Sequence, residues 1–163
     1  MNKDKIIYIL LAIKTIRKKG YKIKLNWITP RKPKINNNEE AIINPKQNII
    51  GDILRNTDIY VCASMYESFC LPVLEAMTCG AAVITTDNGG NMDFVIENNN
   101  ALIINKKDVK DIVEKIEKLI NNSELREKIA KHGVYTSKKY SWSNTIKQLV
   151  DYYKGISNYK VKD

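Results

Sequence analysis

Apolar residues recur along the chain at two spacings, and segments with the two spacings alternate. Where they recur every three to four residues they predict helices, over 4–19, 49–56, 71–78, 91–96, 108–120, 123–131 and 143–154. Short runs rich in β-branched residues predict strands over 22–28, 59–63, 82–86 and 101–104. The polar stretch 29–48, which contains Pro30, Pro33 and Pro45, is predicted to be a loop.

Strands that alternate with helices predict the α/β class, here a Rossmann-like parallel sheet with helices on both faces. The last three strands are apolar at most positions, which is typical of strands that are buried on both faces. We expect a single domain over residues 1–163, with a helical C-terminal extension over about 141–158. Ligands of such sheets bind beyond the carboxyl ends of the strands, so we expect a site at the loops 64–70 and 86–91.

Composition agrees with one globular domain. Of 163 residues, 44% are apolar and 28% are charged. The three cysteines, Cys62, Cys70 and Cys79, form no Cys-x-x-Cys pair, and His132 is the only histidine. These counts exclude a zinc ribbon, a disulfide framework and a His-centred triad within the chain. We expect reduced thiols, no metal and a cytoplasmic location.

The net charge of +9 is unevenly distributed. Residues 1–34 hold 11 Lys and Arg against 1 acid, residues 35–105 hold 2 against 9, and residues 106–163 hold 14 against 8. The basic flanks fit either solvated lysines on helix surfaces or a patch that binds an anionic membrane surface. The best cluster for such a patch is Arg17, Lys18 and Lys19. Basic and aromatic residues are not interleaved, so no nucleic-acid partner is expected.

Two carboxylates, Glu67 and Glu75, stand eight positions apart around the predicted start of the helix 71–78. A carboxylate accepts paired hydrogen bonds from neighbouring hydroxyls, whereas free amides at a helix start bind phosphate. The order hydroxyl, diphosphate, hydroxyl is that of a nucleotide sugar, which such a site would suit. The spacing alone equally fits a simpler arrangement, in which Glu75 complements the helix dipole and Glu67 is a surface residue.

The second loop reads Asp87-Asn88-Gly89-Gly90-Asn91 and lies between a strand and a predicted short helix. Glycine in this place allows a positive φ angle and a close approach of the backbone to a ligand. An ordinary tight turn uses the same residues, so both interpretations stay open at this point.

Read as one stretch, residues 64–90 resemble a known family. They read Ser-x-x-Glu-Ser-Phe-x-Leu-Pro-x-Leu-Glu-Ala-Met-x-Cys-Gly-x-x-Val-Ile-x-x-Asp-x-Gly-Gly. This pattern closely resembles the donor-binding half of the group 1 glycosyltransferases, retaining enzymes of the GT-B fold. The Glu-x7-Glu motif in this context is highly specific, unlike the bare spacing. The resemblance continues through Asn99-Asn100-Ala101-Leu102-Ile103 and Tyr140-Ser141-Trp142 and covers roughly residues 4–155.

The resemblance implies roles for the residues of the two loops. Glu75 would hold the ribose hydroxyls, and Glu67 would contact the transferred sugar as the catalytic residue. The backbone amides implied to lie near the sugar or the diphosphate are those of Phe69, Cys70 and Leu71. The other implied donor-binding residues are Ser68, Asn88, Gly89 and Gly90. The family usually works without a metal, and it carries glycine where this chain has Cys70.

The resemblance also implies what the chain does and what it needs. It would be the donor-binding half of an enzyme that moves a sugar from a nucleotide sugar to a glycan or lipid-linked acceptor, with retention, in the synthesis of cell-envelope polysaccharide. The family's first strand and its acceptor-binding domain have no counterpart here, so we expect an acceptor domain in cis or in trans and little activity of the chain alone. A location at the inner membrane face is also implied. The alternative is a catalytically silent nucleotide-sugar-binding or regulatory module of the same fold.

Overall fold

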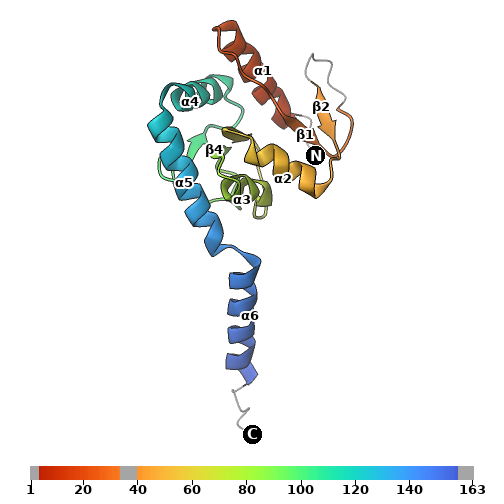
Figure 1. Cartoon of the computed structure of the whole chain (residues 1–163), viewed down its shortest axis with the longest axis vertical. Helices are drawn as coiled ribbons and strands as arrows, with labels where there is room; N and C mark the ends of the chain where they lie inside the picture. Colours follow the sequence, from red (N-terminus) through yellow and green to blue (C-terminus); the bar gives the residue numbers. More distant parts are fainter. Residues whose placement is uncertain (1–3, 34–39, 158–163) are drawn as a thin grey trace.

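Strand β4 (Ala82–Thr86) is the centre of the fold and has a parallel strand on each side (Figure 1). The computed structural model describes residues 4–33 and 40–157. β4 pairs with β3 (Ile59–Cys62) at one edge and with β5 (Ala101–Ile104) at the other. These parallel pairs confirm the predicted α/β class, and the boundaries of β4 and β5 agree with the predicted ones.

The described chain contains six helices. They are α1 (Asp4–Lys18), α2 (Gln47–Arg55), α3 (Leu71–Thr78), α4 (Val109–Asn121), α5 (Ser123–Lys139) and α6 (Trp142–Ser157). The predicted helix over 71–78 is confirmed at both ends, with Pro72 in its first turn, where a missing N–H costs nothing. Asp108 caps α4, because its side chain accepts a hydrogen bond of 3.0 Å from the Asp111 N–H.

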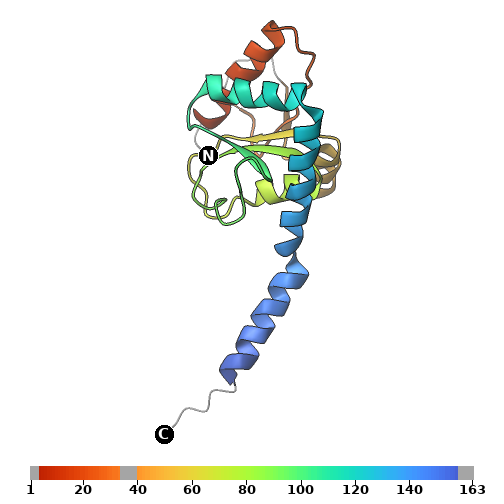
Figure 2. The same cartoon turned by 90° about the vertical axis from the view of Figure 1, so that its left-hand side faces the viewer.

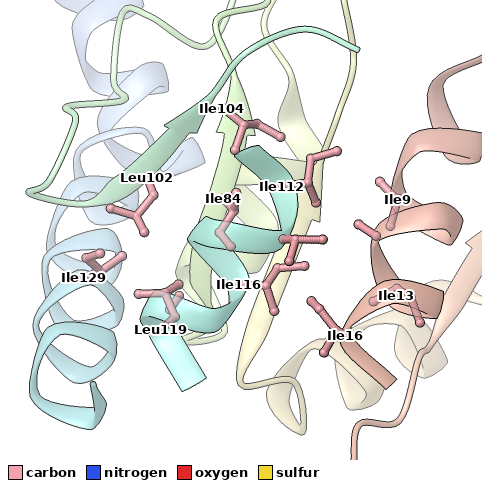
Figure 3. Close-up of a cluster of buried hydrophobic side chains, with 13 residues drawn as sticks. Ile9, Ile13, Ile16, Ile84, Leu102, Ile104, Ile112, Ile116, Leu119 and Ile129 are labelled. Carbon is pink, nitrogen blue, oxygen red and sulfur yellow. The ribbon is translucent and has the colours of Figure 1, made fainter. Parts of the chain in front are cut away.

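Helices cover both faces of the β3–β5 sheet, which confirms the predicted layering. On one face, α1, α4 and α5 form a core with the sheet, and Figure 3 shows Ile9 and Ile16 of α1 close to Ile116 of α4. On the other face, a second core joins α2 and α3 to the sheet through residues such as Leu54 and Val73. All five residues of β4 are buried because this strand contributes side chains to both cores.

Strand β3 was expected to be buried, but each of its four residues is only half-buried. The reason is its place in the sheet: β4 pairs with one edge of β3, and no described strand pairs with the other. Side chains still alternate between the two faces, as a strand requires. Ile59 and Val61 pack against the core of α1 and α4, whereas Tyr60 and Cys62 pack against the core of α3.

The N-terminal strand prediction is only partly correct. A strand was expected over 22–28, whereas β1 spans Trp27–Thr29 and pairs in parallel with β2 (Ala41–Ile43). Residues 22–26 keep the alternation of a strand, since Ile23 and Leu25 are half-buried and the neighbouring lysines are exposed. They join no described ladder. β2 lies inside the predicted loop 29–48, and its three residues are too few to show the alternation that reveals a strand.

Two helix predictions also need correction. Residues 91–96 form turns rather than a helix. The helix predicted over 123–131 continues as α5 to Lys139, so His132 and Gly133 lie within it and not at its end. Gly133 faces α3, and its lack of a Cβ permits this packing: an added Cβ would lie 3.1 Å from the Met77 side chain.

Helix α6 extends away from the rest of the molecule, as both Figure 1 and Figure 2 show. It forms the predicted C-terminal extension; residue 158 of that prediction lies outside the described residues. Every residue of α6 from 142 to 156 is exposed, and the large apolar ones include Trp142, Ile146, Leu149 and Tyr153. These four recur every three to four residues and therefore share one face of the helix.

Candidate functional site

The two loops singled out in the sequence lie against each other at the carboxyl ends of β3 and β4. The Glu67 N–H donates to the carbonyl oxygen of Asn88 (3.0 Å), and the Gly90 N–H donates to the carbonyl oxygen of Glu67 (3.1 Å). These bonds accompany a parallel bridge between Glu67 and Gly89. The Thr86 hydroxyl also donates to the carbonyl oxygen of Ser64. Residues 64–70 and 86–91 therefore form one joined structure, which we call the double loop.

Glycine suits the two positions of the double loop for different structural reasons. Gly89 has a φ angle of 85°, a conformation that favours glycine. At Gly90 the constraint is contact: an added Cβ would overlap the carbonyl group of Ser68 and lie 2.5 Å from the nitrogen of Phe69. Of the two interpretations left open in the sequence, one was a close approach to a ligand; at Gly90 the close approach is made to the neighbouring loop.

Helix α3 begins at an unusual residue. Cys70 precedes it with φ 62° and ψ 53°, in the left-handed region, and its side chain makes no capping hydrogen bond. A residue other than glycine in this conformation costs about 1 kcal/mol or more. Cys70 is nevertheless buried, with 6% of its surface exposed. The Cys70 carbonyl oxygen accepts a hydrogen bond of 3.0 Å from the Val73 N–H, and Pro72 has no N–H, so the first-turn amide that an anion could use is that of Leu71.

The two carboxylates of the motif are both exposed and lie near one half-buried tyrosine. Burial, followed by the negative charges of Cys62, Cys70, Glu75 and Glu67, raises the pKa of Tyr60 above its ordinary value. All four acidic groups therefore act on the Tyr60 phenol. The sequence analysis did not select Tyr60; its only signal was its place in β3, two residues before the strand ends.

Glu75 also has a partner on another helix. Its Oε1 accepts a hydrogen bond of 3.4 Å from Nε2 of Gln47, the first residue of α2. The contact places the start of α2 beside α3, next to the carboxylate that the motif implies for the ribose. Gln47 was also missed in the sequence, because 28 positions separate it from Glu75.

Buried asparagines hold the second loop in shape. The backbone N–H groups of Asn88 and Asn91 each donate to the other's side-chain oxygen, at 3.2 and 3.1 Å. Nδ2 of Asn91 donates to the Thr85 hydroxyl (3.0 Å) and to the carbonyl oxygen of Thr86 (2.9 Å). These bonds take the backbone away from the helix predicted over 91–96. Among the described residues, Asn88 Nδ2 is the buried side-chain donor for which no acceptor is found.

An aromatic cluster supports the first loop. The ring of Phe69 packs against Phe94 at 5.5 Å and Tyr140 at 5.9 Å between ring centroids. The Tyr140 hydroxyl donates to the carbonyl oxygen of Asp93 (3.0 Å), which ties the end of α5 to the segment that follows the second loop. The side chain of Phe69 is thus structural, and a ligand would meet its backbone.

Two cysteines meet at the double loop. Sγ of Cys62, at the end of β3, lies 3.8 Å from Sγ of Cys70. The hydrogen bond between them lowers the pKa of Cys62, with burial acting in the opposite direction, and the same bond together with burial raises the pKa of Cys70. The Asn88 side chain also acts on Cys70, and it lowers the pKa by a smaller amount. Both shifts favour the thiolate of Cys62 over that of Cys70.

The described residues contain neither a metal-binding cluster nor a membrane-spanning helix. Within 4–33 and 40–157 we find no group of three or more His, Cys, Asp or Glu side chains arranged to hold a metal ion. No helix in the part of the chain that the structure describes combines the length and the apolar character needed to cross a membrane.

The fold is that of GT-B glycosyltransferases. The structure of a mutant of S. aureus TarM, in complex with Fondaparinux, alpha-GlcNAc-glycerol and UDP, matches 93% of this chain and 33% of that one, with a TM-score of 0.77 and 21% identity. The C-terminal domain of the group 1 glycosyl transferase LpcC from Francisella tularensis is 38% identical, with a TM-score of 0.56 over 60% of this chain and 50% of that one.

The chain belongs to the glycosyl transferases group 1, whose family model matches residues 31–134. Among curated relatives, the capsular polysaccharide biosynthesis glycosyltransferase CapM of Staphylococcus aureus is 34% identical over 142 residues, which is 80% of this chain and 37% of the relative. The match covers between 11% and 37% of the length of these curated relatives.

Proposed function

We propose that this chain is the donor-binding part of a glycosyltransferase that moves a sugar from a nucleotide sugar to an acceptor, with retention. The observation that carries this proposal is the double loop, which brings Glu67, the start of α3 and the Asn88–Gly90 turn together. Family membership supports the same class of reaction. TarM, which shares the fold, has been solved with bound UDP.

Each part of the proposed site suits one part of the donor. Glu75 accepts hydrogen bonds from the ribose hydroxyls, and the backbone amides of Phe69, Cys70 and Leu71 lie near the sugar or the diphosphate. Glu67 contacts the transferred sugar as the catalytic residue. Charge-assisted hydrogen bonds of this kind are worth roughly 1.5–3 kcal/mol each.

The remaining proposed donor contacts come from the rest of the double loop and the first residue of α3. They are Ser68, Phe69, Cys70, Leu71, Asn88, Gly89 and Gly90. Asn88 adds a specific argument, because its Nδ2 is buried without an acceptor among the described residues. An unsatisfied buried donor costs roughly 1–3 kcal/mol, and an oxygen of the ligand would remove that cost.

We propose that residues 1–163 form one donor-binding domain and that an acceptor-binding domain, in cis or in trans, completes the enzyme. One surface supports this partner: the apolar face of α6 is exposed, with Trp142 at 81% and Ile146 at 54%. The sheet of the donor-binding domain itself also has unpaired edges, at β3 and at the strand-like residues 22–26, which no described strand pairs. Doubly wound sheets follow the strand order 3-2-1-4-5-6, and one further parallel strand between β1 and β3 would give this order.

The proposed acceptor is a glycan or a lipid-linked glycan of the cell envelope, and the proposed location is cytoplasmic, at the inner face of the membrane. The name of CapM, which refers to capsular polysaccharide, supports the first part. The basic cluster at the end of α1 offers less to a membrane than the sequence indicated. Lys19 pairs with Glu117 at 2.7 Å, and Arg17 donates to the carbonyl oxygen of Ile23 at 3.3 Å.

Calorimetry with four donors tests donor binding: UDP-glucose, UDP-N-acetylglucosamine, GDP-mannose and ADP-glucose. We expect one of them to bind, and Glu75→Gln and Glu67→Gln each to weaken it about tenfold or more, from the loss of one charge-assisted hydrogen bond. Glu124→Gln, an exposed change in the first turn of α5, is the matched control and leaves affinity unchanged. A 2′-deoxyribose donor that binds as well as its ribose counterpart would contradict the role of Glu75.

A transfer assay tests the need for a partner. Incubated alone with a donor that it binds, the chain should transfer sugar to an added acceptor at no more than a trace rate, because one half cannot position both substrates. Rapid transfer by the chain alone would contradict the proposed need for an acceptor-binding domain.

The alternative is a nucleotide-sugar-binding or regulatory module without catalysis. The observation in its favour is Cys70, which occupies with a buried side chain the left-handed position at the start of α3. Absence of heat with all four donors at millimolar concentration would favour a regulatory role over the donor-binding one.

A further inference from the structure

We propose that Cys62 and Cys70 form a reversible disulfide that switches the donor site off, an inference that rests on the proposed function for its effect on binding. The two residues bracket the first loop: Cys62 ends β3 and Cys70 precedes α3. Their sulfur atoms are 3.8 Å apart in the reduced form. The bond length of a disulfide is about 2 Å, so closure needs a movement of roughly 2 Å shared between a strand end and a helix start.

Several features of the reduced Cys62–Cys70 pair favour disulfide formation. The sulfur atoms of Cys62 and Cys70 are within hydrogen-bond distance, and this contact lowers the pKa of Cys62, which favours its thiolate. Cys62 is half-buried, so the residue keeps some exposure to solvent. Cys70 is buried beside it, and the same contact together with burial raises its pKa. A thiolate next to a second thiol is the arrangement that yields a disulfide instead of a more oxidised sulfur.

A peroxide is the proposed oxidant, and the electrons balance as follows. The Cys62 thiolate attacks one oxygen of hydrogen peroxide, the O–O bond breaks, and the products are Cys62 sulfenic acid and hydroxide, which takes up a proton to give water. The Cys70 thiol then attacks the sulfenic sulfur, the S–O bond breaks, and a second water leaves. Two thiols lose two electrons, and one peroxide gains them. A small dithiol such as dithiothreitol reverses the step by exchange.

Closure would disturb the donor site through two contacts. The residues between the two cysteines include Glu67, Ser68 and the Phe69 backbone, so a shift at Cys70 moves the start of α3 and the first loop with it. The backbone of Ser68 and Phe69 is already in close contact with Gly90 and has no space to move toward it. A second effect falls on Cys70 itself, whose left-handed backbone at the start of α3 would be tied to the end of β3.

The third cysteine provides an internal control. Cys79 follows α3 at its other end, is half-buried, and has no sulfur partner among the described residues. The free chain has three thiols, so formation of the proposed disulfide leaves one. Cys79→Ser should form the disulfide as the unmodified chain does, whereas Cys62→Ser should not. Cys70→Gly removes the partner thiol and suits the positive φ angle, so this variant is expected to stay folded.

The experiment treats the reduced chain with hydrogen peroxide, quenches it in acid, and measures free thiols and mass. We expect thiols to fall from three to one, mass to fall by about 2 Da, and a peptide digest to link Cys62 to Cys70. Calorimetry with the donor that binds the reduced chain should show affinity reduced about tenfold or more, and dithiothreitol should restore it. Cys70→Gly should gain oxygen mass instead and form no internal link.

Each of the following results would contradict a different part of the proposal. Three free thiols after peroxide, or a link that involves Cys79, would overturn the disulfide. A Cys62–Cys70 link with unchanged donor affinity would overturn the switch and leave the proposed function intact. If the reduced chain binds none of the four donors, the proposed function and the switch both fail, and the thiol count and mass alone decide whether the disulfide forms.

Discussion

The β3–β5 half of the molecule and the N-terminal segment from Tyr21 to Ile43 are built from similar residues but differ in completeness. In the first half, β4 has a parallel neighbour on each side and is buried over all five residues. In the second, residues 22–26 show an alternation of half-buried and exposed side chains, yet the described ladder contains only Trp27–Thr29 and Ala41–Ile43. Side-chain pattern gives a segment its two faces, but hydrogen bonds from a neighbour are what make it a strand.

The largest contrast should appear in amide hydrogen exchange. Amides of β4 should open only with global unfolding, which for a domain of this size requires about 5 kcal/mol or more, whereas amides of residues 22–26 should open at almost no cost. The expected difference in protection is therefore at least about a thousandfold. Mass spectrometry on peptides from both regions measures it. Equal protection would mean that residues 22–26 have partners of their own, and the comparison would fail.

Adding a methyl group at Gly90 should destabilise the β3–β5 half of the molecule. Gly90→Ala places a Cβ against the backbone of Ser68 and Phe69, which belong to the joined loop and cannot both move away. We expect a loss of about 3 kcal/mol or more in the free energy of unfolding. Urea denaturation measures this loss.

The control for that change lies in the N-terminal region. Gly20 has φ 93° but open space around its Cβ position, so Gly20→Ala should cost only the conformational strain, about 1 kcal/mol. If both alanine variants lost the same stability, contact between the two loops would not be the reason for glycine at position 90.

Removing the buried side-chain amide of Asn91, in the β3–β5 half, should reduce stability more than removing the exposed amide of Asn121, beside the N-terminal region. Asn91→Ala removes the acceptor of the Asn88 N–H and the donor of two bonds, so we expect a loss of about 2–3 kcal/mol. Asn121→Ala removes one exposed bond of 2.9 Å to the Tyr21 hydroxyl and should cost less than about 1 kcal/mol. Thermal unfolding of the two variants compares them. A larger loss at Asn121 would reverse the comparison.

The smallest effect should come from the ion pair that joins the end of α1 to α4. Lys19 and Glu117 are 2.7 Å apart, with 49% and 20% of their side chains exposed. Solvent and salt screen such a pair, so Lys19→Met should cost about 0.2–1 kcal/mol and less in high salt. Unfolding at about 0.05 M and about 1 M salt measures both effects. A loss that stays above this range at high salt would contradict this account, because it would indicate that Lys19 stabilises the protein through packing rather than through charge.

The elements that the sequence predicted best are those with a strong local signal. The boundaries of α3, β4 and β5 match the predicted ranges, because each has an apolar pattern bounded by a proline, a glycine or a polar turn. The residues of both loops were also selected in the sequence, since their order along the chain is the family's pattern. That pattern alone is sufficient to indicate the family.

Contacts between distant positions were decided only by the tertiary structure. The joining of Glu67 to Asn88, the contact of Gly90 with the first loop, and the meeting of Glu75 with Gln47 bring together residues that lie more than twenty positions apart. The turns at 91–96 were missed for the same reason, because the buried amides that form them replace a helix only when the sheet surrounds them. Local periodicity reports which side of an element is apolar, whereas the packing of whole elements determines which residues meet.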